Sequence, residues 1–320
     1  MQYGKENAII DNSGILAETR HNVALWLSKN FADVMISQMI KLSAFSDEAG
    51  NSIEEQIDAV KRNGIPYVEL RSIDGKNVAD FTLEEAKSYQ AEFEKNGVAV
   101  WSIGSPLGKV DVDVDFDEYE KKVRHVCQLA NVFKTDKIRM FSFFKAYEKP
   151  EKVYEYLRKM VEIGAEYGVC MHHENEKDVF GDSAERVLSI MENVKGLKFI
   201  YDPANYLQCG EPAEKTMDMF YTKTDYFHVK DVIAETGELV PAGHGDGQIQ
   251  TLIERVEGDK VFTLEPHLIA FDSYKSIDDT EMKLKFVFNS NAEAFDAAVT
   301  AMKKLLAQAG YKEVNGGFVK

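Results

Sequence analysis

The chain has 320 residues, of which 44% are hydrophobic and 29% are charged, a composition that excludes a disordered, fibrous or collagen-like protein. Its 38 basic and 54 acidic side chains give a formal net charge of −16 at pH 7. A surface this negative repels phosphate backbones and anionic lipid, so neither nucleic acid nor a membrane surface is an expected partner. The three cysteines (Cys127, Cys170 and Cys209) have neither disulfide-framework nor metal-knuckle spacing, which fits a reducing compartment.

Residues 1–40 differ from the rest of the chain and are predicted to form an N-terminal extension. They begin MQYGKENAIIDNSG, with acidic, amide and glycine residues where a signal peptide needs a basic end and then an apolar stretch. No run approaches the ~20 apolar residues that span a bilayer. We therefore expect a cytoplasmic protein, with residues 1–40 as a candidate contact between subunits of a homo-oligomer.

From residue 41 onward, short apolar runs alternate with amphipathic stretches that have a period near 3.6 residues. Helices are predicted in these stretches, and the first two open with capping-box spacing, Ser52 with Glu55 and Thr82 with Glu85. The runs predicted as strands are KLSAFS (41–46), YVELRS (67–72), VAVWSIG (98–104), KIRMFSFF (137–144), VCMHHE (169–174), KFIYD (198–202), YFHVK (226–230) and VFTLE (261–265).

This alternation predicts an α/β fold with parallel strands and right-handed crossovers. Eight strand–helix units favour a closed (β/α)8 TIM barrel over an open doubly wound sheet. An open nucleotide-binding sheet is further disfavoured because no G-x-G-x-x-G or Walker-type loop follows any run. The predicted barrel occupies residues 41–310 and is followed by a C-terminal tail, residues 311–320.

Four residues that commonly bind metals stand at or near the ends of four successive late runs: Glu174, Asp202, His228 and Glu265. Active-site residues of such barrels sit at the C-terminal ends of the strands. Any one of the four alone would be read as a salt-bridge partner or a helix cap, but their common placement indicates a site. Three carboxylates and one imidazole suit Mn²⁺ or Mg²⁺ with open positions, and suit Zn²⁺ or Co²⁺ less well.

Several motifs in the same order resemble a known family. These are HHEN (172–175), YDPAN (201–205), HVKD (228–231), AGHGDG (242–247) and TLEPH (263–267). They look like the xylose-isomerase-like TIM-barrel superfamily of sugar and sugar phosphate isomerases and epimerases.

The resemblance implies that the four residues bind one divalent ion, most fittingly Mn²⁺, with Mg²⁺, Co²⁺ or Zn²⁺ as alternatives. It also implies that Glu174 and Glu265 are the pair of glutamates that moves the proton. The implied reaction is isomerisation or epimerisation of a small carbohydrate through a metal-stabilised enediolate.

Four neighbouring residues are candidates for substrate contact. Lys230 lies two residues after His228, and His267 lies two after Glu265, so on a regular strand each faces the same way as that ligand. Lys230 would either hold a substrate hydroxyl or neutralise the acidic cluster. Asn175 and Asn205, from the HHEN and YDPAN motifs, complete the expected set.

Three further polar residues are expected to be structural. Glu69 resembles the family's second-strand glutamate and is predicted to support the barrel or its mouth rather than bind metal. Arg139 lies inside an apolar run and is predicted to pair with the acidic cluster. His173 should face the helices, because its neighbour Glu174 faces the barrel interior.

Other functions stay open on the same residues. Asn205 stands where many ketose epimerases and hydroxypyruvate isomerases of the superfamily carry a histidine. A lyase or dehydratase is therefore an alternative, similar to inosose dehydratases or to subunits that cleave oxidised C-glycosides. A non-catalytic sugar-binding subunit is a third reading. The type IV apurinic endonuclease branch is disfavoured, since the early strands end in SIDG and IGSP without its histidines.

Overall fold

The structure is a computed structural model that describes residues 38–271 and 282–320. The predicted N-terminal extension, residues 1–40, lies outside the described residues except for its last three. None of the helices in the described ranges combines the length and apolarity that a membrane crossing requires.

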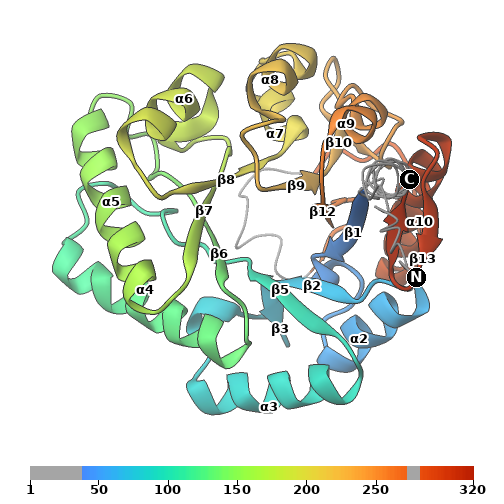
Figure 1. Ribbon diagram of the computed structural model, residues 1–320, viewed down its shortest axis with the longest axis horizontal. Helices are drawn as coiled ribbons and strands as arrows, with labels where there is room; N and C mark the ends of the chain where they lie inside the picture. Colours follow the sequence, from blue (N-terminus) through green and yellow to red (C-terminus); the bar gives the residue numbers. More distant parts are fainter. Residues whose placement is uncertain (1–37, 272–281) are drawn as a thin grey trace, which may run out of the picture. The chain divides into compact units, whose positions relative to one another are not determined.

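All eight runs predicted as strands form strands in the structure, and these strands make a closed parallel barrel (Figure 1). Each strand pairs with the next along the chain, and the barrel closes where the last strand pairs with the first, from Ile40–Lys260 to Ala44–Leu264. The predicted TIM barrel is therefore confirmed. The barrel strands are β1 (Met39–Ala44), β2 (Tyr67–Leu70), β5 (Ala99–Ile103), β6 (Lys137–Met140), β7 (Cys170–Glu174), β8 (Lys198–Tyr201), β9 (Tyr226–Val229) and β12 (Lys260–Leu264).

The helices surround the barrel in Figure 1, and their buried apolar faces pack against the outer sides of the strands. In chain order they are α2 (Ile53–Arg62), α3 (Leu83–Lys95), α4 (Phe116–Val132), α5 (Pro150–Glu166), α6 (Ala184–Asn193), α7 (Pro203–Gln208), α8 (Ala213–Phe220), α9 (Ile249–Arg255) and α10 (Asn291–Gln308).

The predicted capping boxes begin the first two of these helices. The Ser52 hydroxyl accepts a hydrogen bond from the Glu55 backbone N–H, and the Glu55 carboxylate accepts one from the Ser52 N–H. Thr82 and Glu85 repeat the arrangement at α3. Both pairs satisfy backbone donors that the first helical turn leaves without a partner.

Short elements supplement the barrel. The 3₁₀ helices are η1 (Ser46–Glu48), η2 (Val78–Asp80) and η3 (Phe180–Asp182). The antiparallel hairpins are β3 (Ser72–Ile73) with β4 (Lys76–Asn77), β10 (Asp231–Ile233) with β11 (Glu238–Val240), and β13 (Lys312–Val314) with β14 (Gly317–Val319).

The last hairpin occupies the residues expected to be a C-terminal tail. Asn315 and Gly316 both have positive φ, as a type I′ turn requires, and Asn-Gly is a strong sequence signal for that turn. β14 then pairs antiparallel with β1, from Met39–Val319 to Ile40–Phe318, and the Phe318 side chain is buried. The end of the chain thus adds two strands beside the first barrel strand.

The barrel interior is polar where the functional candidates lie. On β2, Val68 and Leu70 belong to the apolar core, whereas Glu69 between them reaches Tyr226 and His228 inside the barrel. This alternation follows from the pleat of the strand, which sends successive side chains to opposite faces.

Candidate metal centre

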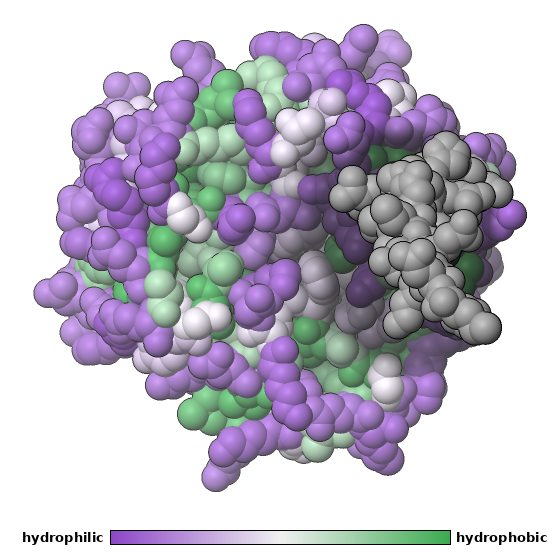
Figure 2. Space-filling model, viewed as in Figure 1, coloured by the Kyte–Doolittle hydropathy of each residue, from purple (hydrophilic) through white to green (hydrophobic). Residues whose placement is uncertain are grey.

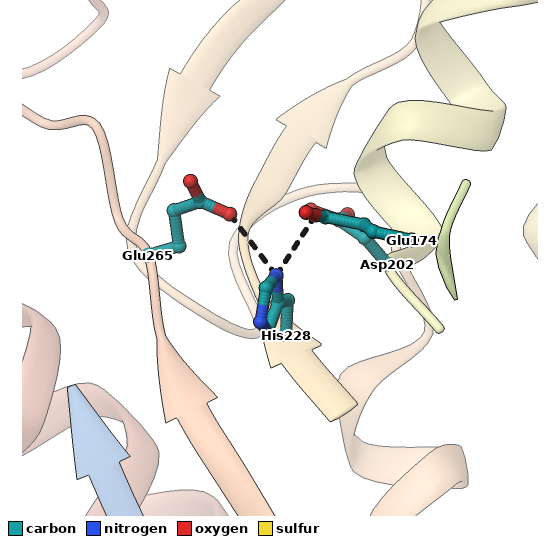
Figure 3. Close-up of side chains that lie close together, drawn as sticks. All are labelled: Glu174, Asp202, His228 and Glu265. Carbon is teal, nitrogen blue, oxygen red and sulfur yellow. Dashed lines mark hydrogen bonds and ion pairs between the residues drawn. The ribbon is translucent and has the colours of Figure 1, made fainter. Parts of the chain in front are cut away.

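The four predicted ligands come together at one end of the barrel. Glu174 is the last residue of β7, Asp202 follows β8, His228 lies within β9, and Glu265 follows β12. Each offers a ligand atom, and these atoms all lie within 4.8 Å of one another. All four side chains are buried. Figure 3 shows Glu265 on one side of His228, with Glu174 and Asp202 on the other.

His228 lies between carboxylates on both sides of its ring. Its Nδ1 is 2.8 Å from Glu174 Oε1 and 3.3 Å from Glu265 Oε2, while its Nε2 is 3.1 Å from Glu69 Oε2. Burial alone lowers the pKa of His228, but Glu174 and Glu69 outweigh it and hold the pKa well above its ordinary value. The glutamates on both sides of the ring thus favour positive charge on the imidazole.

The two carboxylate oxygens of Asp202 have different roles, since one caps a helix and the other is directed into the centre. Its Oδ1 accepts hydrogen bonds from the backbone N–H groups of Ala204 and Asn205 and so caps α7. Its Oδ2 lies 3.2 Å from Lys230 Nζ. Burial raises the pKa of Asp202 above its usual range. Lys230 opposes this shift, whereas the negative charges of Glu174 and Glu265 add to it.

The donor set fits a divalent cation. Asp202 Oδ2 and Glu265 Oε2 are buried and accept no hydrogen bond from the described residues, although Lys230 Nζ and His228 Nδ1 lie near them. Buried carboxylate oxygens with unused lone pairs, converging with one imidazole nitrogen, are the ligands that Mn²⁺ and Mg²⁺ take.

Each of the two glutamates has one carboxylate oxygen bound by a different arginine. Arg139 Nη1 donates to Glu174 Oε2 at 3.3 Å, and Arg71 Nη1 donates to Glu265 Oε1 at 3.0 Å. The other oxygens, Glu174 Oε1 and Glu265 Oε2, face His228. Burial raises the pKa of Glu265, but Lys230 and His228 outweigh it and keep that pKa well below its usual value. Arg139 thus makes the contact with the acidic cluster that was expected of it.

Sequence reasoning missed a second group of charges built around Arg71. The Arg71 guanidinium donates to both oxygens of Asp47, at 2.9 and 3.0 Å, and to Glu48 Oε1 at 3.1 Å. Burial raises the pKa of Glu48 to about 8, with Arg71 opposing the shift. Arg71 follows β2 directly and Asp47 lies just beyond β1, so the strand-end argument, applied to the early strands, would have found them.

Of the substrate candidates, Lys230 and His267 lie beside the centre. Burial lowers the pKa of Lys230, but Asp202 and Glu265 outweigh it and hold the pKa above its ordinary value. His267 donates its backbone N–H to Glu48 Oε2 at 2.7 Å, and its Nε2 lies 3.6 Å from Glu265 Oε1.

The two asparagines brace the ligands. The Asn175 side chain bonds both backbone polar groups of Asp202, donating to its carbonyl oxygen at 2.8 Å and accepting from its N–H at 2.9 Å. Asn205 Nδ2 donates to the Asn175 carbonyl oxygen and, at 3.4 Å, to Glu174 Oε1. Asn205 Oδ1 is buried and accepts no hydrogen bond from the described part of the chain.

The glycine-rich AGHGDG segment wraps around Asp231, next to Lys230. The Asp231 carboxylate accepts backbone N–H groups from Gly243, Gly245 and Gly247 at 2.8 to 3.0 Å. A Cβ atom on Gly245 would lie 2.5 Å from Asp231 Oδ1, so only glycine allows this close approach. The motif therefore fixes the loop after β9 beside the centre.

The prediction that His173 faces the helices is also confirmed. His173 is buried on the outer side of β7, where its ring packs against Phe199 and next to Gly181.

Figure 2 shows that hydrophilic side chains predominate around the rim of the face that is in view, with apolar patches between them.

Comparison with known proteins gives a family match. The family model described as "Xylose isomerase-like TIM barrel" matches residues 57–278. No curated protein sequence matches the chain.

Solved structures share the fold at low sequence identity. The probable 3-DHS dehydratase AsbF from Bacillus anthracis, involved in petrobactin synthesis, is 16% identical with a TM-score of 0.61, covering 82% of this chain and 98% of its own. A xylose isomerase-like TIM barrel protein from Mycobacterium smegmatis in complex with magnesium is 12% identical with a TM-score of 0.60, covering 85% and 97%. An L-ribulose 3-epimerase is 14% identical with a TM-score of 0.62, covering 85% and 97%. Identities this low show the fold alone.

Proposed function

Because the chain belongs to the xylose isomerase-like TIM barrel family, we propose that it is a metal-dependent isomerase or epimerase of a sugar or sugar phosphate. The proposed reaction moves a proton at a carbon next to a carbonyl group. One observation carries the proposal: four buried ligand atoms converge within 4.8 Å, and two of them belong to glutamates that face each other across His228.

In this proposal Glu174, Asp202, His228 and Glu265 hold one divalent ion, for which we propose Mn²⁺. The oxygen-rich donor set favours hard cations, and a relative of the same fold is in complex with magnesium. When bound, the ion supplies a Lewis acid that stabilises negative charge developing on the substrate oxygens. Glu69 fixes the tautomer of His228, because an Nε2–H directed at Glu69 leaves Nδ1 as the ligand atom.

Glu174 and Glu265 are the proposed proton carriers. Arg139 and Arg71 each hold one carboxylate oxygen, so the other oxygen of each glutamate stays directed at the centre. A positioned carboxylate that takes up or returns a proton contributes typically 10²–10⁴-fold to a rate. Two such groups on different strands can remove a proton at one position and return it at another.

Two further side chains are proposed to contact the substrate. Lys230 Nζ is buried and lies 3.2 Å from Asp202 Oδ2. Asn205 Oδ1, which accepts no hydrogen bond from the described residues, is suited to accept one from a substrate hydroxyl. We also propose that His267 lines the mouth, while Asn175 holds Asp202 in place.

A lyase or dehydratase is the second candidate. The sequence feature that favours it is Asn205, which stands where many ketose epimerases and hydroxypyruvate isomerases of the superfamily that the sequence resembles carry a histidine. A relative of the same fold is a probable dehydratase. The same two glutamates would then remove a proton while a neighbouring group leaves, in place of reprotonation.

Turnover in deuterated water separates the two functions. The protein, loaded with Mn²⁺, would be incubated with ketoses, ketose phosphates, keto-inositols and 3-keto-glycosides, and the products followed by NMR. Deuterium at a carbon next to the carbonyl, with the substrate's composition otherwise kept, supports isomerisation or epimerisation. A new double bond supports the lyase. Bound sugar without turnover, in a chain that binds no divalent ion, would favour a non-catalytic subunit.

A further inference from the structure

A second group of metal-ligand side chains lies beside the proposed centre and shares Glu265 with it. Glu48, Glu265 and His267 each offer a ligand atom, and these atoms lie within 4.8 Å of one another. All three side chains are buried. The two groups together resemble a pair of adjacent cation sites bridged by one carboxylate.

The Arg71 guanidinium already occupies the second position. It contacts Glu48 Oε1 at 3.1 Å and Glu265 Oε1 at 3.0 Å, and it binds both oxygens of Asp47. Its side chain is only 1% exposed. The rings of Phe45 and Phe271 lie 4.4 and 5.0 Å from its central carbon, so the planar group has aromatic contacts in addition to its carboxylate partners.

Electrostatics explains why a cation is required at this point. Three acidic side chains surround Arg71, and buried carboxylates without a counter-ion are strongly destabilising. The carboxylates of Asp47, Glu48 and Glu265 with the imidazole of His267 repeat the ligand types of the first centre, three acids and one histidine. A divalent ion is therefore the natural substitute for the guanidinium.

We propose that Arg71 acts as a fixed internal cation in the place of a second divalent ion, and that it thereby limits the centre to one metal. It also takes Glu265 Oε1 as a hydrogen-bond acceptor and leaves Oε2 for the first ion. The inference rests on the metal site of the proposed function but goes beyond it, because the number of ions is a separate property.

Arg139 provides a matched comparison. It is buried like Arg71, contacts Glu174 at 3.3 Å and Glu265 at 3.8 Å, and lies 5.0 Å from the same Phe45 ring. In the described ranges, however, no second set of acids and histidine surrounds it, since its remaining bond goes to the Gly104 carbonyl oxygen. Removing Arg139 deletes the same charge without opening a cation site.

The test counts ions per chain. The wild-type protein and the variants Arg71→Ala, Arg71→Lys and Arg139→Ala would be saturated with Mn²⁺, freed of loose metal by gel filtration and analysed for metal and protein. We expect one ion in the wild type, two in Arg71→Ala, and one or fewer in Arg71→Lys and Arg139→Ala. Two Mn²⁺ ions bridged by Glu265 should also couple magnetically, so only Arg71→Ala should lose the paramagnetic resonance spectrum of an isolated ion.

The count in Arg71→Ala relative to the wild type decides the inference. A folded Arg71→Ala chain with the same number of ions as the wild type overturns it, and so does a gain of one ion in Arg139→Ala. Should Arg71→Ala unfold in chelator, Mn²⁺ must restore its circular dichroism, and failure to do so also overturns the proposal. A wild-type chain that binds no ion contradicts the proposed function instead, so the two failures are distinguishable.

Discussion

His228 Nε2 lies 3.1 Å from Glu69 Oε2, on the side of the ring opposite to Glu174 and Glu265. Both groups are fully buried, and Tyr226 donates its hydroxyl to the other oxygen of Glu69. Glu69 is thus held in place from β9 and in turn orients the imidazole. A carboxylate behind a metal-binding histidine fixes the ring and raises its basicity.

Glu69→Gln should therefore weaken Mn²⁺ binding by about 10- to 100-fold, the usual cost of losing such a partner. The glutamine keeps the volume but removes the charge that holds the His228 proton on Nε2. Isothermal titration with Mn²⁺ measures the change. Ser102→Ala is the matched control, because the Ser102 hydroxyl bonds the Tyr226 hydroxyl, at 3.2 Å, and makes no side-chain hydrogen bond to His228 or Glu69 in the described part of the chain. Equal affinities in Glu69→Gln and the wild type would contradict this role.

Asp202 links metal binding to helix capping, and two variants separate these roles. Asp202→Asn keeps an oxygen for the backbone N–H groups at the start of α7, whereas Asp202→Ala does not. Both should abolish Mn²⁺ binding. Asp202→Ala should be less stable than Asp202→Asn by about 1 kcal/mol, the typical value of an N-cap. Urea unfolding without metal measures this difference.

Ser183→Ala is the control for capping alone. Ser183 caps α6 by accepting the Arg186 N–H, outside the ligand cluster. It should lose about 1 kcal/mol of stability and keep its Mn²⁺ affinity. If Asp202→Asn still binds Mn²⁺ as the wild type does, the ligand set is wrong.

The barrel could be predicted because local and global signals agree along most of the chain. Each apolar run is bounded by turn residues, and the helices carry their own caps, as Ser52 and Thr82 show. The hairpin at Asn315 and Gly316 was missed although its turn signal is present. Its flanking strands are only three residues each, and their partner, β1, lies at the other end of the chain.

The site could be predicted where its residues lie at the C-terminal ends of the barrel strands. The four ligands of the late strands obey that rule, and the structure brings them together. The bonds from Arg71 to Asp47 and Glu265 span 24 and 194 positions in the sequence. No periodicity reports such contacts, because they depend on barrel closure and on which face each side chain takes.

His173 should make stability depend on pH. Burial lowers its pKa from 6.5 to about 3 in the folded protein, so below pH 6.5 the unfolded chain binds a proton that the folded chain refuses. The free energy of unfolding therefore falls as pH falls from 6.5 toward 3, by up to about 1.4 kcal/mol per pH unit for this one proton.

Urea unfolding between pH 7 and pH 4 tests this. His173→Leu should show a shallower loss of stability than the wild type over that range. Met171→Leu, on the same strand, changes apolar packing without removing a titratable group and should keep the wild-type slope. Equal slopes in His173→Leu and the wild type would show that this histidine takes up its proton without unfolding.

The glutamate pair gives the sharpest test of the mechanism. Glu174→Gln and Glu265→Gln keep the side-chain volume but remove a proton acceptor. Each should lower turnover on the true substrate by at least about 10²-fold, the low end of the contribution of a positioned acid or base. Mn²⁺ affinity should fall less than in Asp202→Ala, because an amide oxygen can still coordinate the ion whereas alanine offers no ligand atom.

The double variant shows whether the two glutamates act together. Groups that serve one proton transfer are strongly non-additive, so the pair of changes should cost little more than the worse single change. Glu211→Gln is the control, because its carboxylate pairs with Lys215 away from the ligand cluster, and it should leave turnover unchanged. Metal content must be measured in every sample. Near-normal turnover in either metal-loaded single variant would mean that another group moves the proton, with Lys230 and His267 the next side chains to replace.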